Sequence, residues 1–113
     1  MAKRTELEMV KAGLSAHKKH GYDVQVTSEE AFEILKATGG ICRYCKKPMV
    51  RGEGKMHDRS PTIDRINNEK VMTKDNVQYI CKQCNTTKGA HTHDEFIGFL
   101  RNLRNSFKAR NIQ

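Results

Sequence analysis

Four cysteines are the first residues of this sequence whose type and spacing predict chemistry. They form two Cys-x2-Cys pairs on either side of residues 46–80, and they are Cys42, Cys45, Cys81 and Cys84. Each pair can form a tight turn that points two sulfurs at one ion, so two pairs complete a tetrahedral site. All four positions are then thiolates, which predicts a structural zinc ion that joins two halves of a small core. Unrelated free cysteines are the alternative; a redox pair is disfavoured because no β-α-β pattern surrounds either pair.

A second set of polar residues lies between and just after the cysteine pairs. In the stretch IDRINNEKVMTKDNVQYICKQCNTTKG these residues are Asp64, Asn76, Asn85 and Lys88. Asn85 begins a predicted helix directly after the second pair, and Lys88 follows on the same face. A strand carboxylate that faces a helix amide offers oxygen ligands to a hard cation, and water and phosphate complete the shell. Plainer roles are a surface ion pair for Asp64, a turn for Asn76 and a helix cap for Asn85.

Two predicted strands must position these residues. Alternation of apolar and polar side chains favours a strand around 62–66, and a second strand is expected around 77–80. An irregular loop through Arg59 precedes the first strand, and the second strand runs into the second cysteine pair, which leads into a helix. The hairpin and the helix after it therefore carry all four polar residues.

Three further helices are expected outside this region. Helix formers fill residues 5–20, and a Thr27–Glu30 capping box starts a helix that ends at the glycines 39–40, after a short extended piece at 22–26. A capping box at Thr92 starts the last helix. Its apolar residues recur at helical spacing and are expected to be core; they are Phe96, Phe99, Leu100, Leu103 and Phe107.

The bulk composition fits one small, basic domain. The chain has 113 residues, a formal net charge of +8, 36% hydrophobic residues and no tryptophan. Such a core is thin, so a metal staple is plausible, and the positive charge favours an anionic partner such as nucleic acid. Neither an apolar run of bilayer length nor a secretory signal is visible, so we expect an intracellular protein that does not enter membranes. In a reducing compartment, four cysteines favour metal ligation over two disulfides.

Taken jointly, these residues resemble the zinc-containing branch of the HNH endonucleases. The family pattern runs Cys-x2-Cys, then Asp-His on the first strand, a loop Asn, and then Cys-x2-Cys-Asn-x2-Lys. The resemblance covers about residues 39–100 and includes the HDEFIGFL helix. The matching residues are Cys42, Cys45, Asp64, Asn76, Cys81, Cys84, Asn85 and Lys88. The resemblance implies an α+β fold: a small ββα-metal core stapled by a four-cysteine zinc site and flanked by N- and C-terminal helices.

The same resemblance implies roles for the residues. Asp64 and Asn85 would bind the catalytic divalent ion, with Mg2+ or Mn2+ expected, and Asn76 would brace the loop between the strands. Lys88 would lie near the scissile phosphate or support the site. The ion would polarise the phosphodiester of a DNA duplex and stabilise the leaving 3′-oxygen. Contacts to nucleic acid are expected from Arg59, Arg65, Lys82 and Lys88.

One position departs from the family pattern, because Arg65 stands where the family places its general-base histidine. Arginine stays protonated, so it cannot take a proton from water, although it can hold a phosphate. The sequence resembles a subset of phage and bacterial HNH-like proteins that read Asp-Arg-Ile here. His57 could serve as the base from the preceding loop, or else His91 or His93. Alternatively, water is activated without a protein base, or the protein binds DNA without cutting it.

The function predicted from these observations is a metal-dependent DNA endonuclease that nicks or cuts with low sequence specificity, since no base-reading module is recognisable. The alternatives are a non-catalytic zinc-stapled module that binds nucleic acid, and a component of a phage DNA-processing or packaging assembly with a phage or host protein partner. A basic N-terminal helical region is expected at 1–38, and the nuclease core with its C-terminal helix at 39–113. The expected location is the cytoplasm of a bacterial host.

Overall fold

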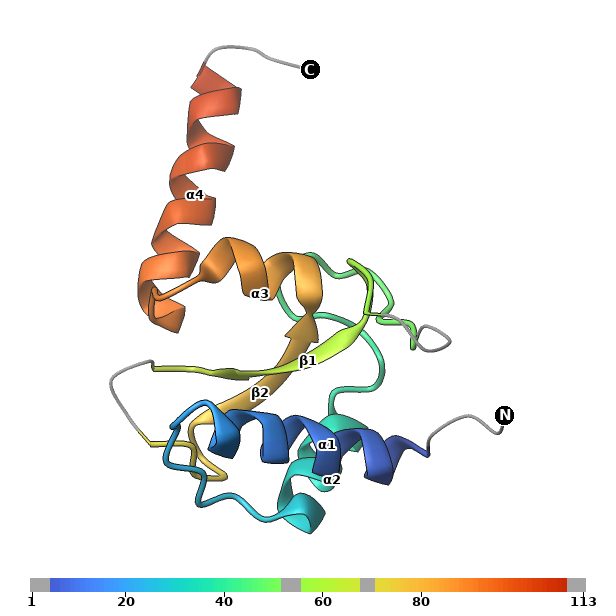
Figure 1. Cartoon of the computed structure of the whole chain (residues 1–113). Helices are drawn as coiled ribbons and strands as arrows, with labels where there is room; N and C mark the ends of the chain where they lie inside the picture. The colour runs from blue at the N-terminus through green and yellow to red at the C-terminus, as the bar shows by residue number, and fades with distance from the viewer. Residues whose placement is uncertain (1–4, 52–55, 68–70, 110–113) are drawn as a thin grey trace.

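A two-stranded antiparallel sheet and four helices form the part of the chain that the structure, a computed structural model, describes: residues 5–51, 56–67 and 71–109 (Figure 1). The predicted α+β class is confirmed, and both strands begin and end within one residue of the expected ranges. In chain order the elements are α1 (Glu6–Lys19), α2 (Ser28–Ala37), β1 (Pro61–Arg65), β2 (Val77–Cys81), α3 (Lys82–Lys88) and α4 (His93–Ala109).

Capping boxes define where helices begin, as the sequence predicts. The Thr27 hydroxyl accepts a hydrogen bond from the Glu30 backbone N–H at 3.1 Å, and the Glu30 carboxylate accepts one from the Thr27 N–H at 2.9 Å. Thr92 and Glu95 make the same reciprocal pair at the start of α4. These bonds satisfy backbone donors that the first turn of a helix leaves without partners.

The register of the hairpin assigns its side chains to two faces. Asp64 of β1 lies opposite Gln78 of β2, and Ile63 lies opposite Tyr79. Because successive side chains of a strand alternate between faces, the Ile63–Tyr79 pair lies on one face of the hairpin and the Asp64–Gln78 pair on the other. Ile63 and Tyr79 are buried among apolar side chains of the N-terminal helices, whereas Asp64 is within ion-pair distance of Lys88 in α3.

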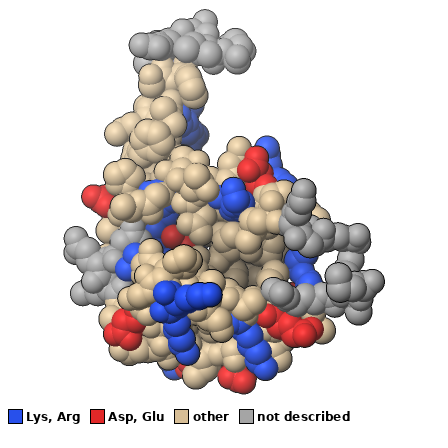
Figure 2. Space-filling view, viewed as in Figure 1, with Lys and Arg blue, Asp and Glu red and all other residues tan. Residues whose placement is uncertain are grey.

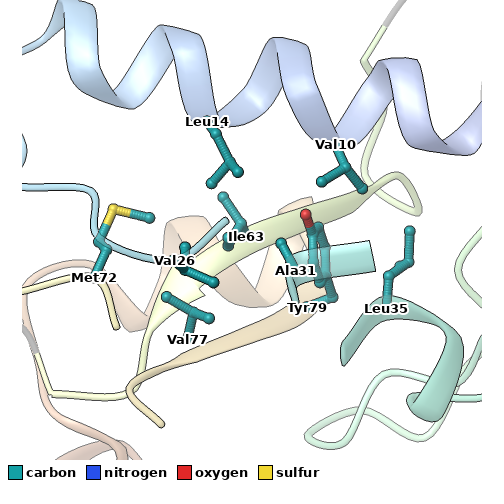
Figure 3. Packing of buried hydrophobic residues seen from close by; sticks show 9 residues of the cluster. All are labelled: Val10, Leu14, Val26, Ala31, Leu35, Ile63, Met72, Val77 and Tyr79. Carbon is teal, nitrogen blue, oxygen red and sulfur yellow. The ribbon is translucent and has the colours of Figure 1, made fainter. Parts of the chain in front are cut away.

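The larger core lies between the hairpin and the two N-terminal helices. In Figure 3, Val10 and Leu14 point down from α1 toward Ile63 and Tyr79. Residues on both sides of position 38 therefore share one core; the division at 38/39 stays a prediction. The nine buried residues of this core, the apolar core below, are Val10, Leu14, Val26, Ala31, Leu35, Ile63, Met72, Val77 and Tyr79.

A short backbone ladder also ties the N-terminal part to the hairpin loop. Residues 22–26 include Val24, which forms a parallel β-bridge with Met72. The Met72 carbonyl accepts from the N–H groups of Gln25 at 2.9 Å and Val26 at 2.8 Å. The extended piece that the sequence predicts at 22–26 is thus held against the loop that precedes β2.

The last helix departs from the prediction. α4 projects away from the body of the molecule (Figure 1), and of its apolar stripe only Phe96 is buried, edge-on to the Tyr44 ring. Phe99, Leu103 and Phe107 are 46%, 40% and 52% exposed, so the expectation that the stripe is core is wrong for these three residues, whereas Leu100 is half-buried. Periodicity shows that a helix has an apolar face but not that the same chain covers it. None of the described helices has the length and apolar character needed to cross a bilayer.

Candidate active site and metal centre

The four cysteines come together at the end of the hairpin away from the apolar core. Their sulfur atoms all lie within 4.8 Å of one another, and Sγ of Cys45 lies 3.8 Å from Sγ of Cys81. A tetrahedral ion with metal–sulfur bonds of about 2.3 Å places its sulfurs roughly 3.8 Å apart. The donor set and its spacing therefore fit a four-coordinate metal ion. Cys42, Cys81 and Ile80 are buried around it.

The pKa shifts of the cysteine thiols differ in direction within the cluster. Burial raises the pKa of Cys81 and of Cys84, because a thiolate loses hydration there. Burial opposes the Cys45 thiolate as well, but hydrogen bonds led by the Arg59 guanidinium lower the pKa of Cys45 to about 6. Arg59 Nη2 lies 3.5 Å from that sulfur and 3.1 Å from the Pro48 carbonyl oxygen. Arg59, predicted to contact nucleic acid, is thus held against the cysteine turn.

Asp64 is nearly buried and carries a buried partner. Lys88 Nζ lies 3.1 Å from Asp64 Oδ2, with the two side chains 0% and 5% exposed, and it also donates to the Arg65 carbonyl at 2.9 Å. Gln78 Nε2 donates to the same Oδ2 at 3.0 Å. A carboxylate is tolerated in such a place because a cation and a hydrogen-bond donor compensate it. The predicted phosphate contact by Lys88 does not fit this position; of its two possible roles, its place agrees with supporting the site.

Gln78 connects Asp64 to a network that the sequence did not reveal. Its Oε1 accepts from Arg43 Nη1 at 2.8 Å, and its Nε2 donates to the Tyr44 hydroxyl at 2.9 Å. The Tyr44 hydroxyl lies 2.7 Å from Nδ1 of His93. Burial, followed by the positive charge of Arg43, lowers the pKa of His93. The contacts with Arg43 and Tyr44 hold the Gln78 amide in place, and that amide in turn orients the Asp64 carboxylate. The one signal for Gln78 in the sequence is its place opposite Asp64 in a hairpin.

Asn85 is oriented by two hydrogen bonds. Its Nδ2 donates to the Thr62 hydroxyl at 2.9 Å and to the Ile63 carbonyl at 3.3 Å. An amide whose nitrogen is engaged in this way turns its oxygen to the other side, which is the atom that a hard cation takes. Lys88 and Gln78 both contact Oδ2 of Asp64, so Oδ1 is the Asp64 oxygen suited to a cation. Both residues therefore have one oxygen suited to ligation.

Asn76 lies at the base of the loop between the strands. Its Oδ1 accepts from the Asn67 N–H at 2.9 Å, and its Nδ2 donates to the carbonyls of Asn67 and Val71, both at 3.0 Å. These bonds close the loop on both sides, which fits the bracing role predicted for it. The partners of its side-chain amide are backbone groups of this loop.

A cleft of about 710 Å³ brings the proposed ligands together. Asp64, Arg65 and Asn85 line one wall, and side chains of α1 line the other. Figure 2 shows this face hollowed between α1 and α3, with Lys and Arg side chains around the hollow. The Arg65 guanidinium lies 4.6 Å from the centre of the Tyr22 ring, which also lines the cleft. The structure thus brings three of the predicted site residues to one hollow.

The remaining predicted residues lie elsewhere. His57, His91, His93 and Lys82 are absent from the described residues that line the cleft. His57 Nδ1 accepts from the Arg59 N–H at 3.1 Å, and Lys82 is the first residue of α3. One histidine that sequence reasoning missed does line the cleft: His17 of α1. No motif marks it, because only the packing of α1 beside the hairpin brings it there.

The comparisons with known proteins agree with this architecture. No family model matches the chain, and no curated protein matches it. Among solved structures, the chain is similar to the rare-cutting HNH restriction endonuclease PacI, which is described for a mechanism of DNA perturbation. The TM-score is 0.67 at 18% sequence identity, and the match covers 99% of this chain and 86% of that one. The chain therefore has an HNH-like α+β fold with a four-cysteine cluster.

Proposed function

We propose that this chain is a metal-dependent DNA endonuclease. The observation that carries the proposal is the cleft in which Asp64 and Asn85 each have an oxygen suited to a hard cation, on an HNH-like fold. Mg2+ or Mn2+ is the expected ion, since carboxylate and amide oxygens with water suit both. Bound there, such an ion would polarise the phosphodiester and stabilise the charge on the leaving 3′-oxygen.

The chain's own residues would prepare the site around that ion. Lys88 and Gln78 hold Asp64 in place through Oδ2, and the Thr62 hydroxyl and Ile63 carbonyl hold Asn85. Arg65 would grip a phosphate oxygen from the cleft wall, where Tyr22 supports its guanidinium plane. We further propose that the four cysteines hold zinc, whose role is to fix the start of α3 and with it Asn85.

DNA duplex is the substrate that the charge favours. The net charge of +8 attracts a phosphate backbone without reading its sequence, so binding is expected to weaken steeply with salt. We retain nicking or low sequence specificity as the proposal, with action in the cytoplasm of a bacterial host. Because PacI is described as rare-cutting, an assay must test both a supercoiled plasmid and a long natural DNA.

Plasmid cleavage with Mg2+ or Mn2+ tests the proposal. The variants Asp64→Asn and Asn85→Ala are expected to lose at least about 100-fold in rate, since each removes one ion ligand. Lys36→Gln is the matched control, because Lys36 is exposed on α2, where its contacts are Glu33 at 2.8 Å and the Phe32 ring, and it does not line the cleft. Circular dichroism checks that each variant is folded. Equal rates for the wild type and both site variants would contradict the proposal.

A non-catalytic DNA-binding module is the second candidate, and Arg65 is the observation that favours it. A guanidinium cannot take a proton from water, yet it lies in the cleft as a phosphate ligand would. This candidate expects salt-dependent DNA binding without cleavage under any of the divalent ions. Arg65→His separates the two, because it would then create cleavage rather than alter an existing rate.

A further inference from the structure

We propose that His17 of α1 is the general base of this site, an inference that rests on the proposed endonuclease function. His17 lies far from Asp64 in the sequence but lines the same cleft as Asp64, Arg65 and Asn85. The side chain is half-buried, so it faces the cleft and remains open to water. His17 would act from α1 as the general base, a role that Arg65 of β1 cannot fill because it stays protonated.

A backbone hydrogen bond sets the His17 ring in the form that a base needs. Nδ1 lies 2.8 Å from the carbonyl oxygen of Gly13, one helical turn earlier. A carbonyl only accepts, so Nδ1 carries the proton and the neutral ring presents Nε2 as a free lone pair. An oriented Nδ1–H is the arrangement by which a histidine is held ready to take a proton at Nε2.

The other candidate histidines are engaged away from the cleft. His57 Nδ1 accepts from the Arg59 N–H, and His93 Nδ1 lies 2.7 Å from the Tyr44 hydroxyl. An Nδ1 that accepts places the proton of a neutral ring on Nε2, so Nε2 of His57 has no lone pair to offer. His91 is exposed, and its Nδ1 lies 3.9 Å from the Glu95 carboxylate. None of these three lines the described part of the cleft.

The surroundings of His17 connect it to the phosphate-binding side. Its ring centre lies 5.3 Å from that of Tyr22, whose other neighbour is the Arg65 guanidinium. Besides His17, the titratable or charged residues that line the described cleft are Tyr22, Asp64, Arg65 and Tyr79. Burial raises the pKa of Tyr79 to about 12, so this phenol stays neutral. Asp64 is paired with Lys88, so Arg65 is the cationic side chain among the described residues that line the cleft.

The step balances without a further reactant. A water oxygen forms a bond to phosphorus as its proton passes to Nε2 of His17, and the bond from phosphorus to the 3′-oxygen breaks. The 3′-oxygen takes a proton from solvent, which leaves a 3′-hydroxyl and a 5′-phosphate. His17 then returns its proton to solvent before the next turnover.

The test compares His17→Gln with His57→Gln in the full chain under plasmid-cleavage conditions. Glutamine keeps a polar side chain of similar reach but takes no proton near neutral pH. Loss of a general base costs about 10²–10⁴-fold in rate. We expect His17→Gln to lose at least about 100-fold in kcat with DNA affinity unchanged within about two-fold, and His57→Gln to change kcat by less than about three-fold. We expect added imidazole to restore part of the activity of His17→Ala, and the acid limb of the pH–rate profile to disappear in His17→Gln.

Two results overturn the assignment, and they differ from failure of the endonuclease proposal. Wild-type kcat in His17→Gln excludes His17 as the base. A lower rate that imidazole does not restore, together with weaker DNA binding, shows that His17 only shapes the cleft and likewise overturns the proposal. A wild-type protein that binds DNA but never cleaves it, with Asp64→Asn indistinguishable from it, overturns the endonuclease function and the assignment together.

Discussion

The apolar core and the cysteine cluster at the end of the hairpin are two regions with different chemistry. On one side, β1 and β2 bury the nine side chains of the apolar core against α1 and α2. On the other side, the cysteine cluster buries only Cys42, Ile80 and Cys81, with half-buried neighbours around them. The first side is held by removing apolar surface from water, whereas the second offers four thiols that could hold a metal ion. We therefore expect the second side, and not the first, to depend on an ion.

The candidate site takes residues from both the apolar core side and the cysteine cluster side. Asp64 lies on β1, which shares the apolar core through Ile63, whereas Asn85 follows Cys84 directly and depends on the cysteine cluster. His17 belongs to α1 on the apolar side. Disturbing one half should therefore displace a defined part of the site and leave the rest.

Loss of the ion from the cysteine cluster is expected to have the largest effect. Structural zinc contributes about 10–16 kcal/mol of apparent binding free energy in zinc-finger peptides, most of which is folding free energy. Cys81→Ser, or a strong chelator, should unfold the two Cys-x2-Cys turns and α3 and abolish any cleavage. Hydrogen exchange should rise in α3 and β2 well before it rises in α1 and α2. Uniform protection in the chelated protein, or the absence of one bound metal per chain by native mass spectrometry, would contradict this.

The Lys88–Asp64 pair should give the next effect. Removing one partner of a buried ion pair leaves an uncompensated charge and costs about 3–5 kcal/mol. Lys88→Met is therefore expected to lower the free energy of unfolding by that amount. The double variant Lys88→Met with Asp64→Leu should recover much of the loss, since neither charge remains. Urea denaturation of both single variants and the double variant measures the coupling, and simple additivity would contradict a mutual dependence.

The apolar side can be broken without touching the cysteines. Leu14→Ala removes a buried side chain and should cost about 2–5 kcal/mol. Leu103→Ala, the matched change on α4, should cost under about 0.5 kcal/mol because that side chain is 40% exposed. Thermal unfolding with saturating zinc should show the Leu14 loss undiminished, because zinc does not reinforce this side. Equal losses for the two variants would show that α4 packs against something in solution.

Features of the fold that are determined by residues close together in the sequence could be predicted from it. The capping boxes at Thr27 and Thr92 and the two strands follow from residues within a few positions of one another, and they were predicted. The cysteine cluster was predicted because ligand spacing constrains it even across a long insert. Asp64 and Asn85 were predicted as site residues, and the cleft that they share is consistent with that hypothesis.

The features that were missed depend on how elements pack. The burial of Lys88 follows from α3 lying against β1, which brings its ammonium to Asp64 and the Arg65 carbonyl. The exposure of the α4 stripe follows from the direction in which α4 leaves the body (Figure 1). His17 reaches the cleft only because α1 lies beside the hairpin. A periodic pattern predicts a face, and the partner of that face is a tertiary property.

The Thr27–Glu30 capping box should give the smallest effect, and its pH dependence identifies it. Thr27→Ala is expected to cost about 1 kcal/mol, since a backbone donor in the first turn of α2 loses its partner. Hydrogen bonding to the Thr27 N–H lowers the pKa of Glu30 from its ordinary value of 4.5, against a smaller effect of burial. A carboxyl whose folded pKa is lowered contributes stability above the unfolded pKa, and this contribution disappears as pH falls through the folded pKa. The stability difference between wild type and Glu30→Gln should therefore be constant from pH 7 to about pH 5 and shrink below pH 4.5. Glu29→Gln, one residue earlier and outside the box, is the matched control in the same urea series. If the Glu30→Gln difference persists unchanged at pH 3, the charge of Glu30 does not contribute to the cap and the hydroxyl of Thr27 holds α2 alone.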